Sequence, residues 1–165
     1  MRLIKHYLLS LLLLLSLTPL VAQAEINDAN ALKGVEVGKG VFLLDLANPK
    51  KLLLYLNVIQ GTHAGMKRQG VKPEFVAVII GPTVDYLTSK PKDEIEMEFE
   101  SELKAIKQAV TELSALGVRM EVCAVATDVF KVDNKTLFNG LELVADGFVS
   151  LIGYQTQGYK LVPIY

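Results

Sequence analysis

Residues 95–126 read IEMEFESELKAIKQAVTELSALGVRMEVCAVA, and they carry the clearest structural signal in the 165-residue chain. The apolar residues before Gly117 recur every three or four positions, so they form one stripe along a helix of about six turns. This stripe consists of Ile95, Phe99, Leu103, Ile106, Val110, Leu113 and Leu116. Gly117 supplies a helix stop, and the nearly continuous apolar run 118–126 is typical of a parallel strand buried on both faces. A helix that passes through a glycine into a buried strand predicts an α/β fold.

The same alternation of apolar runs and helical patterns extends along the chain on both sides of this stretch. A second helix is predicted at 146–157, because Asp146 can cap its start and Gly158 can end it, and a shorter helix is predicted after Gly61. Four more apolar runs complete a predicted five-stranded sheet, at residues 52–59, 74–80, 141–144 and 160–164. Strands and helices in alternation imply right-handed crossovers. We therefore predict a three-layer α/β/α sandwich with a mostly parallel sheet.

The first 24 residues have a composition of their own. They contain ten Leu, one Arg and one Lys, whereas all 18 Asp and Glu follow them. The basic start, the apolar run 8–22 and the sequence Ala22-Gln23-Ala24 form the pattern of a cleavable signal peptide. A membrane span needs about 20 apolar residues, and this run is shorter. We therefore predict a signal peptide at 1–24, cleavage after Ala24, a periplasmic or secreted location and no stable membrane insertion afterwards.

Residues 25–49 differ again, because small and polar residues dominate and only 41–46 are apolar enough for a short strand. We interpret them as an N-terminal leader, whose order the sequence leaves open, before a domain at 50–165. Within the leader, the sequence GVEVGKG at 34–40 resembles a phosphate-binding loop. Its spacing is one residue short, and Gly40 stands where such a loop has Ser or Thr. A flexible turn is therefore the better interpretation.

Charge and residue counts exclude several classes of function. The chain has 17 Lys and Arg against 18 Asp and Glu, so it lacks the basic excess of a nucleic-acid-binding protein, and we predict no nucleic acid partner. After residue 24 the chain has one cysteine, Cys123, and one histidine, His63. These two residues cannot form an internal disulfide or a structural zinc site. We therefore predict neither a metal nor a cofactor.

The candidate site follows from the strand ends, since functional groups gather at the carboxyl edge of an open α/β sheet. Cys123 lies near the end of the third predicted strand, where it is either a nucleophile or a small packed hydrophobe. His63 falls in a glycine-bracketed loop after the first predicted strand, and it is a general base, a weak metal ligand or incidental. The other predicted pocket residues are Gly81, Pro82, Thr83 and Asp128.

Several ordered motifs resemble the DsrE/DsrF-like family. They are GVRMEVC at 117–123, DGF at 146–148, QTQGY at 155–159, Pro163 in the last strand and the VIIGP turn at 78–82. The resemblance covers residues 50–165. It implies a DsrE-like parallel sheet, commonly assembled into homo-oligomers such as trimers or hexamers. It also implies that Cys123 corresponds to the cysteine on which relatives carry a persulfide.

Two departures from the family bear on function. Many relatives have a His before the Gly-Pro turn, where this chain has Ile80. An exported protein also lacks the reducing compartment on which persulfide carriers normally rely, although a subunit interface could shelter the thiol from overoxidation.

Two hypotheses about function remain open. The first is an exported sulfur-relay protein, which holds a persulfide on Cys123 and exchanges sulfur with donor and acceptor proteins. The second is a non-catalytic oligomeric module, which binds a small ligand or a protein and merely packs Cys123 in its interior.

Overall fold

The computed structural model describes residues 26–165, and the predicted signal peptide lies outside this range. A five-stranded sheet forms the central layer, with the strand order β4-β3-β2-β1-β5 and every neighbouring pair parallel. The strands are β1 (Val37–Leu44), β2 (Lys72–Ile79), β3 (Arg119–Cys123), β4 (Leu141–Val144) and β5 (Lys160–Ile164). The α/β fold with a parallel five-stranded sheet, predicted from the sequence, is confirmed.

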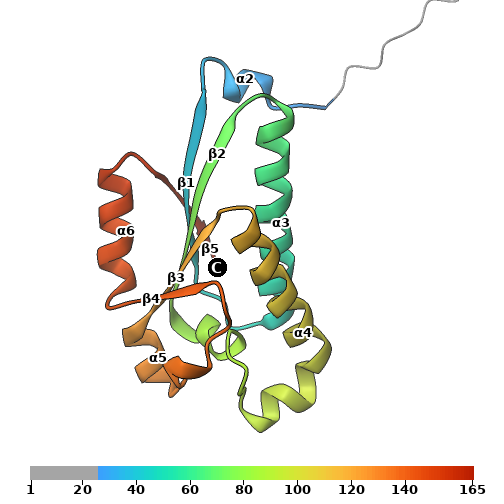
Figure 1. Cartoon of the computed structure of the whole chain (residues 1–165), viewed down its shortest axis with the longest axis vertical. Helices are drawn as coiled ribbons and strands as arrows, with labels where there is room; N and C mark the ends of the chain where they lie inside the picture. Colours follow the sequence, from blue (N-terminus) through green and yellow to red (C-terminus); the bar gives the residue numbers. More distant parts are fainter. Residues whose placement is uncertain (1–25) are drawn as a thin grey trace, which may run out of the picture.

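Helices cover both faces of this sheet (Figure 1). Helices α3 (Pro49–Arg68) and α4 (Asp93–Ala115) lie on one face, and α6 (Gly147–Thr156) lies on the other. The remaining helices are short and connect or precede strands: α2 (Ala29–Leu32), η1 (Gly81–Tyr86), α5 (Ala124–Phe130) and η2 (Asn134–Thr136). Within residues 26–165, no helix combines the length and the apolarity that crossing a membrane requires.

The predicted strand at 52–59 is wrong, because these residues belong to α3. Asn48 caps this helix by accepting hydrogen bonds from the backbone N–H groups of Lys50 and Lys51, and Pro49 occupies its first turn. The buried residues of α3 recur at helical spacing and include Leu52, Leu56, Ile59 and His63. An apolar run of eight residues does not by itself distinguish a buried strand from a buried helix. The shorter helix predicted after Gly61 is the second half of α3.

The first strand of the sheet lies instead in the predicted leader. Strand β1 pairs with β2 on one side and β5 on the other, so the compact fold begins before residue 50. The predicted flexible turn at 34–40 is correct only at Gly34, which has a φ of +75°, since Gly38 and Gly40 lie within β1.

The predicted segment 95–126 folds largely as expected. Helix α4 buries Leu103, Ile106, Val110 and Leu113, and a non-helical residue, Phe99, interrupts its amino-terminal part. Gly117 follows with a φ of +82°, a conformation that glycine adopts readily. Strand β3 ends at Cys123 rather than at residue 126, because α5 begins at Ala124.

Apolar side chains pack on both faces of the sheet, but unequally. The larger cluster includes Phe42, Ile79 and Val122 from the strands and Leu56 and Ile106 from α3 and α4. The smaller cluster, beneath α6, consists of Val41, Val76, Val78 and Leu151. Successive residues of a strand point to opposite faces, which explains why neighbours such as Val41 and Phe42 belong to different clusters.

Candidate functional site around Cys123

Cys123 ends β3 and therefore lies at the carboxyl edge of the sheet, as the sequence predicts. Its side chain is buried, with 6% of its surface exposed. A Cβ atom at Gly147, the first residue of α6, would lie 3.2 Å from the Cys123 Cβ and 2.7 Å from the Ile80 Cγ2. Only a glycine lets the start of α6 approach β2 and β3 this closely. The preceding Asp146 holds that start in place, because its side chain accepts a 2.8 Å hydrogen bond from the Phe148 N–H.

The loop after β2 meets the end of β1 at the same edge. Gly81 has a φ of +56°, and a Cβ atom there would collide with the exposed carboxylate of Asp45. The backbone N–H of Ile80 donates a 3.0 Å hydrogen bond to the Leu44 carbonyl, which continues the sheet pairing to this point. The edge around Cys123 thus combines a thiol, an aliphatic side chain from Ile80, two glycines and one exposed carboxylate.

Thr83 and Pro82 support this edge rather than line a pocket. Thr83 is fully buried, and its hydroxyl accepts a 2.6 Å hydrogen bond from the Leu46 N–H and donates to the Leu46 carbonyl at 3.2 Å. These contacts tie the chain after β1 to η1. Pro82 occupies the first turn of η1, where its missing N–H has no intrahelical partner to lose.

His63 does not join Cys123. It lies in α3, not in a loop, about 21 Å along the helix from Pro49 at the carboxyl edge. Its ring is buried and packs edge-on against Phe75, with 5.8 Å between ring centroids. Burial lowers the pKa of His63, and the nearby Lys67 ammonium lowers it further. The Nδ1 atom of His63 is buried without a hydrogen-bond partner.

Asp128 also stays apart from the thiol. Its side chain is exposed on α5 and lies 3.8 Å from the Lys131 ammonium. The structure therefore brings Cys123, Gly81 and Pro82 to one edge, while His63 lies toward the other end of the sheet and Asp128 extends into solvent. No group of three or more His, Cys, Asp or Glu suited to a metal ion occurs among residues 26–165.

A buried polar network lies near Cys123, and the sequence did not predict it. Glu121 is 5% exposed and lies two residues before Cys123 in β3. It alternates with Val122 of the larger cluster and therefore belongs to the face that α6 covers, whereas Cys123, where the strand ends, packs with the larger cluster and also lies beside the start of α6. One Glu121 carboxylate oxygen accepts a 2.5 Å hydrogen bond from the Tyr154 hydroxyl, which also accepts a 3.1 Å bond from Arg119. The other Glu121 oxygen is buried without a hydrogen-bond partner. Burial, followed by the hydrogen bond to Glu121, raises the pKa of Tyr154.

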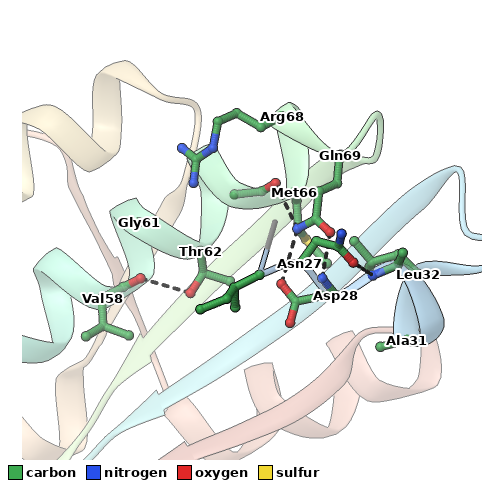
Figure 2. Close-up of a pocket in the computed structure, with 13 residues that line it drawn as sticks. Asn27, Asp28, Ala31, Leu32, Val58, Gly61, Thr62, Met66, Arg68 and Gln69 are labelled. Atoms are coloured by element: carbon green, nitrogen blue, oxygen red, sulfur yellow. Dashed lines mark hydrogen bonds between the residues drawn. The ribbon is translucent and has the colours of Figure 1, made fainter. Parts of the chain in front are cut away.

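A pocket of about 970 Å³ lies between α2 and α3 (Figure 2). Helix α2 lies at the end of the sheet opposite to α5, the helix that follows Cys123 (Figure 1). Gly61, Thr62 and Gly65 line the pocket, as do Asp28 and Gln69, whose side chains are joined by a 3.1 Å hydrogen bond. The predicted site combines the glycine-bracketed loop around His63, residues 61–65, with residues 81–83. The structure separates them, because α3 carries residues 61–65 away from the carboxyl edge.

Exposed apolar side chains flank the thiol on α5 and α6. They are Val125, Val129, Phe148, Val149 and Ile152, each more than half exposed, and we call them the apolar rim. The two helices that carry them follow the carboxyl ends of β3, which ends at Cys123, and of β4, whose last residue, Val144, pairs with Cys123. A soluble protein that exposes several large apolar residues beside a candidate site commonly uses them for contact with another molecule.

The amino-acid sequence also matches a known protein family. The sequence profile of the DsrE/DsrF-like family matches residues 39–164. The chain belongs to the DsrE/DsrF-like family. The match begins inside β1, so the family's domain includes the strand that the sequence analysis assigned to the leader. The resemblance inferred from the motifs at 50–165 is thus confirmed and extended toward the amino terminus.

Solved structures support the DsrE-like fold. A protein of unknown function from Methanobacterium thermoautotrophicum is 19% identical, with a TM-score of 0.61, and the match covers 77% of this chain and 99% of that one. The ychN protein from E. coli is 16% identical, with a TM-score of 0.55 and coverage of 77% and 99%. A protein of unknown function from Bacteroides thetaiotaomicron is 14% identical, with a TM-score of 0.50 and coverage of 78% and 95%. Nothing among curated proteins matches the chain.

Proposed function

We propose that this DsrE/DsrF-like protein carries a sulfur atom as a persulfide on Cys123 and passes it to a partner protein. The observation that carries the proposal is the position of the thiol. It ends a strand at the carboxyl edge of the sheet, where α/β proteins concentrate their chemistry, and it lies beneath a glycine at the start of α6.

The transfer step exchanges one S–S bond for another. The Cys123 thiolate attacks the outer sulfur of a donor persulfide, so that a new S–S bond forms and the donor's S–S bond breaks. The donor leaves as a thiolate and takes up the proton released by Cys123. An acceptor thiolate then attacks the outer sulfur of the Cys123 persulfide and restores the thiol. Each step forms one S–S bond and breaks one, so there is no net oxidation or reduction, and the chemistry requires no redox cofactor.

Access to the thiol requires an opening at its edge. With 6% of its side chain exposed, Cys123 meets a donor only when the start of α6 or of α5 moves outward. Contact with another chain would bury the apolar rim on these helices, and the burial of this apolar surface supplies free energy for such a movement. We infer that the protein forms a homo-oligomer, a trimer or hexamer, through this rim, and that the contact shelters the persulfide from overoxidation.

We further propose that the protein works outside the cytoplasm, after removal of residues 1–24. This proposal rests on the amino-terminal sequence pattern alone. Expression of the full chain in a bacterium tests it. The periplasmic fraction should contain a protein whose intact mass equals that of residues 25–165. Retention of the intact chain in the cytoplasm would contradict it.

A second function has its own supporting observation. Cys123 also packs within the larger apolar cluster, where a small free thiol commonly serves as a hydrophobe. On this alternative, the protein is a non-catalytic oligomeric module that binds a small ligand or another protein. Iodoacetamide labelling separates the two: a purely packed thiol reacts only after denaturant is added, whereas rapid labelling of the native protein contradicts packing alone.

Intact-mass spectrometry tests the carrier function directly. The purified protein is incubated with sodium tetrasulfide, excess donor is removed, and the mass is compared with that of the Cys123→Ser variant. The proposal expects a gain of one sulfur atom in the wild type and none in the variant. An unchanged wild-type mass, under conditions that add sulfur to a control thiol peptide, would overturn it.

Light scattering tests the assembly. The wild type should show an oligomer mass, and Phe148→Asp should lower it, because a carboxylate in the apolar rim opposes burial. The matched control is Leu54→Asp, on the exposed side of α3, which should leave the mass unchanged. A wild-type protein that remains monomeric over a wide concentration range would contradict the proposed assembly.

A further inference from the structure

An apolar groove of about 720 Å³ runs between α3 and the edge strand β5, with β1 at its base. We call it the α3–β5 groove. Val162 of β5 pairs with Phe42 of β1, and Phe42 belongs to the larger cluster, so the groove lies on the face of the sheet that α3 and α4 cover. Cys123 lies at the end of β3, and none of the residues that line the groove belongs to β3, α5 or α6. The groove is therefore a separate feature of the molecule.

Glycine keeps the base of this groove open. Gly40 lies in the middle of β1 and alternates with Lys39 and Val41, so it faces the same side as Phe42. A Cβ atom at Gly40 would meet the Phe42 and Phe75 rings at 3.4–3.6 Å, which leaves room for a side chain. Glycine within a strand weakens it, and it often marks a place where a ligand approaches the backbone closely.

The groove exposes apolar side chains that a globular protein normally covers. Val37, Val58 and Val162 line it, and each is 39–47% exposed. Tyr55 and Ile59 of α3 form its other side. A volume of this size matches the pockets that hold small organic ligands, about 300–1,000 Å³. The combination of concavity and exposed apolar surface favours an occupant with an aliphatic or aromatic body.

Charge distinguishes the two ends of the groove. Lys39 and Lys160 are among its lining residues, and no Asp or Glu is among them. Lys160 pairs with Gly40 and shares the face of Val162, so its side chain belongs to one end of the groove, while Ile164 lies toward the other. Lys39 alternates with Gly40 and faces the α6 side, where its ammonium lies 5.4 Å from the centroid of the Tyr159 ring. Within the part of the chain that the structure describes, Lys160 forms no salt bridge. An apolar base with a cation at one end is complementary to an amphipathic anion.

We propose that the α3–β5 groove binds a small amphipathic anion, with its apolar body against Gly40, Phe42 and Val162 and its carboxylate or sulfonate near Lys160. The site is independent of sulfur transfer, because it uses neither Cys123 nor the apolar rim. A second copy of the chain is the competing occupant. The confined volume and the one-sided charge favour a small molecule.

Fluorescence of 1-anilinonaphthalene-8-sulfonate, displaced by sodium dodecanoate below its micelle concentration, tests the proposal on the mature protein. Dodecyltrimethylammonium has the same chain length and the opposite charge, so it should displace the probe far less. Val162→Asn should weaken dodecanoate binding about tenfold, because it places a polar side chain against the apolar body. The matched control is Leu161→Asn, which is equally exposed (41% against 39%) but faces the α6 side. Its affinity should stay within a factor of about two.

Two further variants keep the test decisive. Lys160→Gln should weaken dodecanoate and leave dodecanol binding unchanged, since only the anion needs the ammonium. Gly40→Val, which fills the base of the groove, replaces Val162→Asn as the deciding variant if circular dichroism shows that the latter is unfolded. Equal effects of the 161 and 162 substitutions, or equal affinity for the two surfactant charges, would overturn the proposal. So would an oligomer that Val162→Asn dissociates, since the groove would then be a contact between copies.

Discussion

The two faces of the sheet are built differently, and the difference separates stability from chemistry. On the face covered by α3 and α4, a large apolar cluster fills the space between two long helices and the strands. On the other face, the ten-residue helix α6 covers a cluster of only four apolar residues. The α6 face also holds the buried Glu121 carboxylate and its hydrogen bond from the Tyr154 hydroxyl.

This contrast indicates where the protein can open without unfolding. The free energy of local opening depends on how much apolar surface an element buries, and α6 buries far less than α3 or α4. Cys123 lies beneath the start of the lightly held helix. We therefore expect substitutions on the α3/α4 face to lower global stability and substitutions beneath α6 to change access to the thiol as well.

Leu113→Ala should have the largest effect on stability. Leu113 is fully buried in α4, within the larger cluster, so truncation removes apolar contacts and leaves a cavity. The expected loss in free energy of unfolding is about 2–5 kcal/mol, measured by urea denaturation. Leu54→Ala, at an exposed position of α3, is the control and should change stability by no more than about 0.5 kcal/mol. A similar small effect at Leu113 would contradict the assignment of the larger cluster as the main source of stability.

Gly147→Ala should act on the α6 face and at the thiol together. The added methyl group meets Ile80 at 2.7 Å and Cys123 at 3.2 Å, which forces the start of α6 outward and costs about 1–3 kcal/mol. Iodoacetamide should then label Cys123 faster than in the wild type. Gly153→Ala lies in the same helix with nothing within 4 Å of the added atom, so it should stabilise the protein by about 0.5–1 kcal/mol. The packing therefore predicts that Gly147→Ala lowers the free energy of unfolding and that Gly153→Ala raises it. Changes of the same sign would contradict it.

Most of the fold could be predicted from the sequence because its strongest signals are local. The apolar stripe of α4, the stop at Gly117 and the apolar run of β3 each follow from spacing within a few turns. The exception is the start of the domain. Residues 52–59 have the composition of a buried strand, and only the Asn48-Pro49 helix start distinguishes them from one. With that helix counted as a strand, the short apolar run at 41–46 stays in the predicted leader, outside the predicted five-stranded sheet, although residues 41–44 form the second half of β1.

The site was less predictable, because its members come together only in three dimensions. Cys123 followed from its place at a strand end, whereas His63 was misplaced along with the misread helix. Glu121 and Tyr154 are 33 residues apart in sequence, and no spacing rule connects them. A single hint was available: a glutamate inside an otherwise apolar strand needs a buried hydrogen-bond partner.

Tyr154→Phe tests that buried network. The substitution keeps the ring, which packs edge-on against Tyr159, but removes the hydroxyl that donates to Glu121. The Tyr154 hydroxyl is the donor to Glu121 in the described chain, and the loss of this hydrogen bond to a buried carboxylate should lower the free energy of unfolding by about 1–2 kcal/mol. Tyr55→Phe, on α3, is the control, since its hydroxyl makes no hydrogen bond within the described chain, and it should change stability by less than about 0.5 kcal/mol. Equal effects of the two substitutions would show that the network contributes nothing to stability.

His63 gives the smallest effect and probes the α3/α4 face by pH. Burial lowers the pKa of this imidazole below its ordinary value of 6.5, so over the range between the two pKa values the unfolded chain binds more protons than the folded one. Stability from this group is therefore complete above about pH 7, and it falls as pH drops through the ordinary value, by at most about 1.4 kcal/mol per pH unit. Urea denaturation between pH 7.5 and 5.5 should show this slope in the wild type, and His63→Leu should reduce it. An unchanged slope in the variant would mean that carboxylates, rather than the buried ring beside Phe75, govern the acid response of this face.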